Sequence, residues 1–130
     1  MLCLIYMKLY IDTTKNSKIE IFLKERGVIV VRKEFEARFS QAEKLLPKIE
    51  EMFNEKAVKL GALEQIRVNS KGSSFTALRI GVVTANSLAY SLGISVKNFE
   101  GESEDFKGIE LVKPEYDREP DITSAKAPLS

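Results

Sequence analysis

The stretch QIRVNSKGSSFTALRIGVVTANSLAYSLGISV, residues 65–96, decides the fold. It opens with a short strand-like segment, Gln65–Asn69, followed by a polar loop. Apolar residues at helical spacing then continue to Leu92, and Gly93 follows in the position that often ends a helix. The chain returns to a strand-like segment at Ile94–Val96. A strand, a helix and a strand in this order predict a parallel, right-handed crossover.

The residues before this stretch predict three further strands and one helix. Apolar residues at helical spacing run from Ala42 to Phe53, and Ser40 with Glu43 forms a capping box before them. The predicted strands, rich in β-branched residues or alternating in polarity, are Lys8–Asp12, Lys18–Lys24 and Val28–Phe35. The order β-β-β-α-β-α-β predicts an α/β fold with a mixed five-stranded sheet and helices packed on it. This is the ribonuclease-H-like topology, which is also the repeated half of the actin-like ATPases.

The composition excludes several kinds of chemistry. The chain has 130 residues, 44% of them hydrophobic, which fits one packed domain. It contains no histidine and a single cysteine, Cys3, so Ser-His and Cys-His catalysis and an internal disulfide are excluded. The apolar start, residues 1–7, lacks the features of a signal peptide and is interrupted before it could span a membrane. We therefore expect a cytoplasmic protein with no metal and no cofactor.

Charge divides the chain into a basic body and an acidic end. Residues 1–98 carry 16 Lys and Arg against 10 Asp and Glu, whereas residues 99–121 carry 3 against 9. We expect one domain over residues 1–97, an acidic loop over 98–108, and a short strand with a proline-containing, partly disordered tail over 109–130. The basic residues of the body are spread over several elements with little aromatic interleaving, so the charge pattern does not predict direct binding of nucleic acid.

The loop before the second helix poses a choice between phosphate binding and a simple helix start. Free N–H groups at a helix start attract anions, and glycines allow a phosphate to come close. Only Gly72 is present here, so the pattern falls short of a phosphate-binding loop. The residues favour a loop that begins a helix.

The second helix is apolar on two faces. One stripe, which we assign to the sheet, contains Phe75, Leu78, Val82, Ala85, Ala89 and Leu92. A second face of mostly small residues contains Ala77, Gly81, Thr84, Leu88 and Ser91. Small residues let another helix approach closely, either from this chain or from a partner, so this helix is a candidate interface.

Four segments resemble the TsaB (YeaZ) family. The stretch SFTALRIGVVTANSLAYSLGI, residues 74–94, is similar to the GSFTGLRIG…A…LA…LGI segment of that family. IDTT, AEKLLPKIEEMF with its internal Pro47, and PEYDREPDIT resemble other family segments in the same order. The resemblance covers about residues 7–97 and the tail.

The resemblance implies a function. TsaB is a non-catalytic, actin-like subunit in the synthesis of N6-threonylcarbamoyladenosine at position 37 of tRNAs that read ANN codons. It binds TsaD, the catalytic subunit, through its two N-domain helices, and the ATPase TsaE joins them. The implied partners are a TsaD-type subunit, a TsaE-type ATPase and, when the chain is alone, a second copy. We expect tRNA contact only through the complex.

The sequence also departs from the family. Family members usually carry a second α/β domain after the strand at Ile94–Val96, and here the acidic loop takes its place, so we expect a short form. The family glycines around the SFT motif fall on Lys71, Ser73 and Ala77, which weakens a phosphate-loop interpretation further.

Three sets of site residues follow from the residues and the resemblance. We expect no catalytic and no metal-binding residue. The expected motif and helix-cap residues are Ser74, Phe75, Thr76 and Leu78, and a vestigial nucleotide site would contain Asp12, Thr13 and Thr14. The expected partner interface is formed by Leu46, Ile49, Phe53, Arg79, Gly81, Thr84, Ala85 and Leu88.

Three alternatives remain open. The first alternative is a degenerate nucleotide-binding module, because Asp12 ends the first predicted strand, where actin-like ATPases place a Mg-associated aspartate. The second alternative is a ribonuclease-H-like nuclease. That chemistry needs further carboxylates clustered with Asp12, and the fourth predicted strand, Gln65–Asn69, contains none. The third is a self-dimerising module without a role in tRNA modification.

Overall fold

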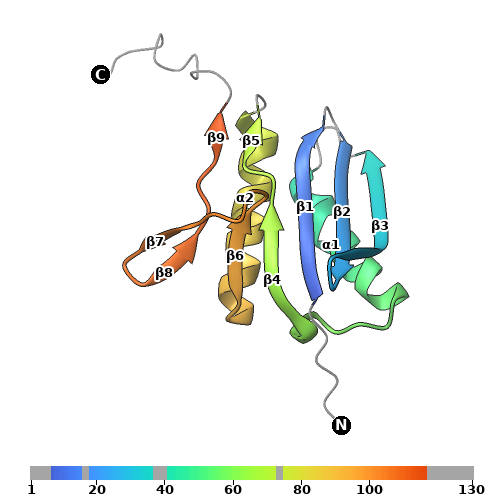
Figure 1. Ribbon diagram of the computed structural model, residues 1–130. Helices are drawn as coiled ribbons and strands as arrows, with labels where there is room; N and C mark the ends of the chain where they lie inside the picture. The colour runs from blue at the N-terminus through green and yellow to red at the C-terminus, as the bar shows by residue number, and fades with distance from the viewer. Residues whose placement is uncertain (1–6, 16–17, 37–40, 73–74, 117–130) are drawn as a thin grey trace.

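The structure, a computed structural model, describes residues 7–15, 18–36, 41–72 and 75–116. Its main sheet has five strands in the order β3-β2-β1-β4-β6 (Figure 1). The first three strands pair antiparallel, and β1, β4 and β6 pair parallel. This confirms the mixed, ribonuclease-H-like sheet predicted from the sequence. The strands are β1 (Met7–Lys15), β2 (Lys18–Glu25), β3 (Val28–Glu36), β4 (Leu63–Val68) and β6 (Ser95–Asn98).

Two helices cover one face of this sheet, behind the strands in Figure 1. They are α1 (Gln41–Glu55) and α2 (Phe75–Leu92), and a short 3₁₀ turn, Leu60–Ala62, leads from α1 into β4. Gly93 ends α2 with a φ of 70°, as predicted, and Ala57 adopts a similar φ of 56° after α1. The predicted capping residue Ser40 lies outside the described residues. Within the described ranges, neither helix is both long enough and apolar enough to cross a membrane.

The alternation of the strands separates a core face from an open face. On β1, Leu9 and Ile11 are fully buried under the helices, whereas Lys8 and Tyr10 point to the other face and stay half-buried. The same alternation buries Ile21 and Leu23 on β2. Both helices join this core, and α2 contributes Leu78, Val82, Ala85 and Ala89, which confirms most of the predicted sheet-facing stripe.

The segment after β6 forms a hairpin, where the sequence predicted an acidic loop over 98–108 followed by a short strand at the start of 109–130. Strands β7 (Glu104–Phe106) and β8 (Ile109–Leu111) pair antiparallel beside β6 (Figure 1). Lys107 and Gly108 connect them with φ values of 53° and 85°, the conformation of a type I′ turn. Strand β8 lies where the short strand was expected. Strand β7 escaped prediction because it is three residues long and carries two charges in place of an apolar alternation.

The chain beyond the hairpin is fixed to α2 and to the loop before it. The Asn86 side chain accepts a hydrogen bond from the Val112 N–H and donates one to the Val112 carbonyl, both at 2.9 Å. A two-stranded parallel pair then joins β5 (Lys71–Gly72) to β9 (Glu115–Tyr116). The end of the predicted tail, residues 117–130, lies outside the described residues.

Glu110 fastens the hairpin to the edge of the main sheet. Burial alone would raise the pKa of its carboxyl, but hydrogen bonds from Lys97, Ser103, Ser95 and the Val96 N–H hold that pKa at about 2. The donor distances are 2.8 Å from Lys97 Nζ, 2.6 Å from Ser103 Oγ and 3.2 Å from the Val96 nitrogen. A carboxylate thus satisfies an N–H group on the outer edge of β6.

Acid should release this attachment. Because the folded pKa of Glu110 lies below the ordinary value of 4.5, its stabilising effect is complete above pH 4.5 and disappears as the pH falls toward 2. We expect the NMR signal of the Val96 amide to shift over that range, and Glu110→Gln to abolish the shift. A Val96 signal that titrates at 4.5 or above in the unmodified chain would contradict the attachment.

Candidate functional site

The Asp-Thr-Thr sequence at the end of β1 is occupied by hydrogen bonds within the fold. Asp12 is 6% exposed, and its Oδ1 accepts hydrogen bonds from the Thr14 N–H at 2.9 Å and from Thr14 Oγ1 at 2.6 Å. Thr13 Oγ1 donates to the Ala77 carbonyl of α2 at 2.7 Å. The three residues of the expected vestigial nucleotide site therefore lie together, and one carboxylate oxygen and both hydroxyls are used to shape the turn and hold α2.

Gly81 allows α2 to lie directly on this turn. A Cβ atom at Gly81 would stand 2.5 Å from Thr13 Oγ1 and 3.0 Å from Thr13 Cγ2. No side chain fits at such distances without a shift of its surroundings. The glycine in the middle of α2 thus has an intramolecular packing role.

The loop between β4 and α2 is likewise tied to its neighbours. Asn69 Nδ2 donates to Thr14 Oγ1 at 3.3 Å, and the Ser70 carbonyl accepts the Glu115 N–H at 2.6 Å. Ser70 is 1% exposed, and its hydroxyl has no hydrogen-bond partner among the described residues. The described part of the loop, residues 69–72, therefore joins β1 and β9 to the start of α2, in agreement with a loop that begins a helix.

The motif residues have mixed positions. Thr76 is exposed in the first turn of α2, and Leu78 is fully buried in the contact between α2 and the sheet. Phe75 begins α2, and Ser74 lies outside the described residues.

The eight expected interface residues divide into two groups. Ile49, Phe53 and Ala85 are at most 2% exposed in the core, and Gly81 is buried against Thr13. A partner cannot reach these four side chains while the chain is folded, so the structure does not support them as interface residues. On α2 the reason is the orientation of the helix, which turns Gly81 toward β1, and on α1 Ile49 and Phe53 join the core cluster. The other four reach the surface, Leu46 and Arg79 exposed, and Thr84 and Leu88 half-buried.

An apolar groove lies where α1 and α2 meet the surface. Its exposed apolar walls are Leu46 on α1, 47% exposed, and Val83 on α2, 56% exposed. Val83 was missed because it belongs to neither of the two helical columns considered in the sequence, although it lies next to Thr84. The residues that line the groove are Leu46, Val83, Thr84, Ser87, Leu88 and Ser91.

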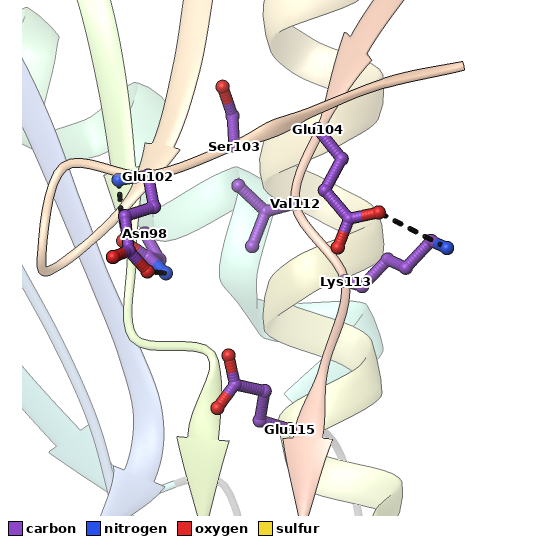
Figure 2. Close-up of a pocket in the computed structure, with 7 residues that line it drawn as sticks. All are labelled: Asn98, Glu102, Ser103, Glu104, Val112, Lys113 and Glu115. Atoms are coloured by element: carbon purple, nitrogen blue, oxygen red, sulfur yellow. Dashed lines mark hydrogen bonds and ion pairs between the residues drawn. The ribbon is translucent and has the colours of Figure 1, made fainter.

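A second, acidic hollow lies between the end of β6 and the segment after β8 (Figure 2). Asn98 organises it, since its Oδ1 accepts hydrogen bonds from the Glu100 and Glu102 N–H groups. Glu104 is paired with Lys113 at 3.2 Å, as the dashed line in Figure 2 marks. Across the described ranges, no group of three or more Asp, Glu, His or Cys residues is arranged to hold a metal ion.

Comparison with solved structures identifies the same fold. YeaZ from Pseudomonas aeruginosa aligns with a TM-score of 0.66 and 24% identity over 72% of this chain and 43% of that chain. A further structure, described as an uncharacterized protein with similarity to peptidase YEAZ from Pseudomonas aeruginosa, gives the same TM-score and identity over 72% of this chain and 42% of that chain. The chain thus spans about two fifths of the length of these proteins. A search of curated proteins found no match.

The sequence itself matches a family model. The model is described as TsaD, tRNA N6-adenosine threonylcarbamoyltransferase, and it matches residues 18–98. These residues include both helices, four of the five strands of the main sheet in full and the loop before α2. Since the match extends over more than half of the sequence, the chain belongs to the TsaD family.

Proposed function

We propose that this chain is a TsaB-like, non-catalytic scaffold subunit in the synthesis of N6-threonylcarbamoyladenosine on tRNA. Its partner is a TsaD-type catalytic subunit, and a TsaE-type ATPase joins the complex. The family match over residues 18–98 is the observation that carries this proposal, because it connects the chain to threonylcarbamoyl transfer to tRNA.

The state of the Asp12 turn supports a scaffold over a catalyst. In a nucleotide site the Asp12 carboxylate and the two threonine hydroxyls would face a ligand. Here Asp12 Oδ1 accepts two hydrogen bonds from Thr14, and Thr13 Oγ1 donates one to the Ala77 carbonyl. A nucleotide would have to displace these hydrogen bonds, and the one from Thr13 connects β1 to α2.

The groove between the helices supports binding of a partner. Leu46 and Val83 expose large apolar side chains beside the half-buried Leu88, whereas the neighbouring Ile49 and Ala85 are fully buried. Apolar side chains around a shallow groove are typical of protein interfaces. We assign the TsaD-type subunit to this groove, and a second copy of the chain to the same surface when the partner is absent.

Reconstitution of tRNA modification tests this function. We expect a TsaD-type subunit and a TsaE-type ATPase from the same genome to modify tRNA only when this chain is added. Val83→Asp places a charge in the apolar groove and should weaken binding of the TsaD-type subunit by about 30-fold or more, as expected for a central interface residue.

Val28→Asp is the matched control, because Val28 is another exposed valine, 64% exposed, at the start of β3. It should leave binding of the TsaD-type subunit unchanged. Full modification without this chain would contradict the scaffold function. Equal effects of the two substitutions would contradict the assignment of the groove.

A further inference from the structure

The open face of the sheet carries a basic hollow near the start of β1 and the β2–β3 turn. Its cationic side chains are Lys8, Lys24 and Arg26, and Glu64 is the one carboxylate in its wall. Tyr10 and Gly27 complete the lining. The hollow lies on the opposite side of the sheet from the α1–α2 groove, so both surfaces can be occupied at once.

The cations of this hollow are placed against one another. Lys8 and Lys24 are direct partners in the antiparallel register of β1 and β2. Like charges directly opposite each other destabilise a sheet. No ion pair joins Lys8, Lys24 or Arg26 to a carboxylate within the described ranges, whereas Glu20 pairs with both Lys15 and Arg32. The arrangement is unfavourable for the fold alone and favourable for an anionic ligand.

Aromatic rings hold one of the cations in place. Lys24 Nζ lies 4.8 Å from the centre of the Tyr10 ring. The Tyr10 ring is stacked on Phe22 at 4.7 Å and is contacted by Phe99 at 5.7 Å. Lys24, Phe22 and Phe99 already contact the Tyr10 ring, so the ring is not available for stacking on a base. The hollow would therefore bind a ligand through its positive charges. This favours recognition of phosphate groups without regard to base sequence.

We infer that this hollow binds the phosphate backbone of the tRNA that the complex modifies. The inference rests on the proposed function for the choice of RNA, and on Lys8, Lys24 and Arg26 for the location. It differs from the sequence-based expectation of indirect tRNA contact, because folding gathers three cations that lie up to 18 residues apart in the sequence. An acidic segment of a protein is the competing ligand for such a surface.

The test is the affinity of the chain for fluorescently labelled tRNA, measured by anisotropy over a series of salt concentrations. The variant Lys8→Gln/Lys24→Gln removes two phosphate contacts. We expect it to bind about 10-fold more weakly, and the slope of log affinity against log salt to decrease in magnitude by about 1.5. The matched control, Lys44→Gln/Lys56→Gln, removes two exposed charges from the α1 side of the molecule and should bind as the unmodified chain does.

Three results would overturn the inference. The first is an equal loss of tRNA affinity in both double variants. The second is absence of tRNA binding at 50 mM salt, because contacts to the phosphate backbone are strongest at low salt. The third is displacement of tRNA by poly-glutamate at a lower charge concentration than by unlabelled RNA. Binding of the TsaD-type subunit is measured in the same variants. Loss of tRNA binding with intact TsaD binding supports both proposals. A chain that binds tRNA through this hollow but not the TsaD-type subunit would contradict the proposed function alone.

Discussion

Gly81→Ala is expected to destabilise the chain by about 1–2 kcal/mol, although alanine is the better helix former. The new Cβ atom would stand 2.5 Å from Thr13 Oγ1, which is fixed by its hydrogen bond to the Ala77 carbonyl. A contact of 2.5 Å is closer than Cβ atoms come in folded proteins, so the cost belongs to the upper part of the overpacking range, about 2–3 kcal/mol. The gain in helix propensity of about 1 kcal/mol offsets part of it. Urea unfolding at pH 7 measures the difference. A leucine at Gly81 would be worse, so it would damage the fold before it could probe an interface.

Two further variants make this prediction specific. Thr13→Ala removes the two nearest atoms that the new Cβ would meet, Oγ1 and Cγ2, and leaves the Thr13 Cβ at 3.3 Å. The double variant Gly81→Ala/Thr13→Ala should therefore recover part of the loss through a coupling of about 0.5–3 kcal/mol. Gly61→Ala is the control, because no atom lies within 4 Å of a Cβ built there. It should change the free energy of unfolding by less than about 0.5 kcal/mol. A neutral or stabilising Gly81→Ala would show that α2 does not lie this close to β1.

Leu9→Ala is expected to cost about 2–5 kcal/mol, the range for a buried leucine whose removal leaves a cavity. Leu9 is fully buried at the centre of β1, opposite Leu23 on β2 and Ile66 on β4. These three side chains form a row across the middle of the sheet, under the helices. Because total stabilities are about 5–15 kcal/mol, this substitution alone should lower the urea midpoint substantially.

Leu46→Ala provides the comparison for Leu9→Ala. Leu46 is 47% exposed at the α1–α2 groove, so its truncation should cost less than about 1 kcal/mol of stability. The same variant should weaken binding of the TsaD-type subunit. If Leu46→Ala destabilised the chain as much as Leu9→Ala, Leu46 would belong to the core and the groove would not be a free surface.

The sheet could be predicted because its sequence signals are local. The alternation over Lys18–Lys24 predicts a strand of the antiparallel part of the sheet, and the order strand, helix, strand over residues 65–96 predicts a parallel pair. The right-handed crossover rule then determines the face of the sheet on which the helix lies. The β7–β8 hairpin could not be predicted in this way. Its stability depends on long-range contacts, above all those of Glu110 with Lys97, which no local pattern reveals.

The candidate surfaces were predicted less completely than the fold. Periodicity shows that α2 is apolar on two faces, but the direction of each face depends on the Gly81 contact with Thr13, which exists only after folding. Gly81 and Ala85 are therefore buried, and Ile49 and Phe53 of α1 belong to the core as well, so half of the expected interface is not on the surface. The basic hollow was invisible for the same reason, since the pairing register of β1 and β2 places Lys8 beside Lys24.

The central claim is that this chain binds a TsaD-type catalytic subunit through its helix layer. Light scattering of the purified chain, alone and mixed with the TsaD-type subunit from the same genome, tests it most directly. The account predicts a particle with the mass of a 1:1 or 2:2 complex, and its loss with Val83→Asp but not with Val28→Asp. A mixture in which the two proteins keep their separate masses would contradict the account.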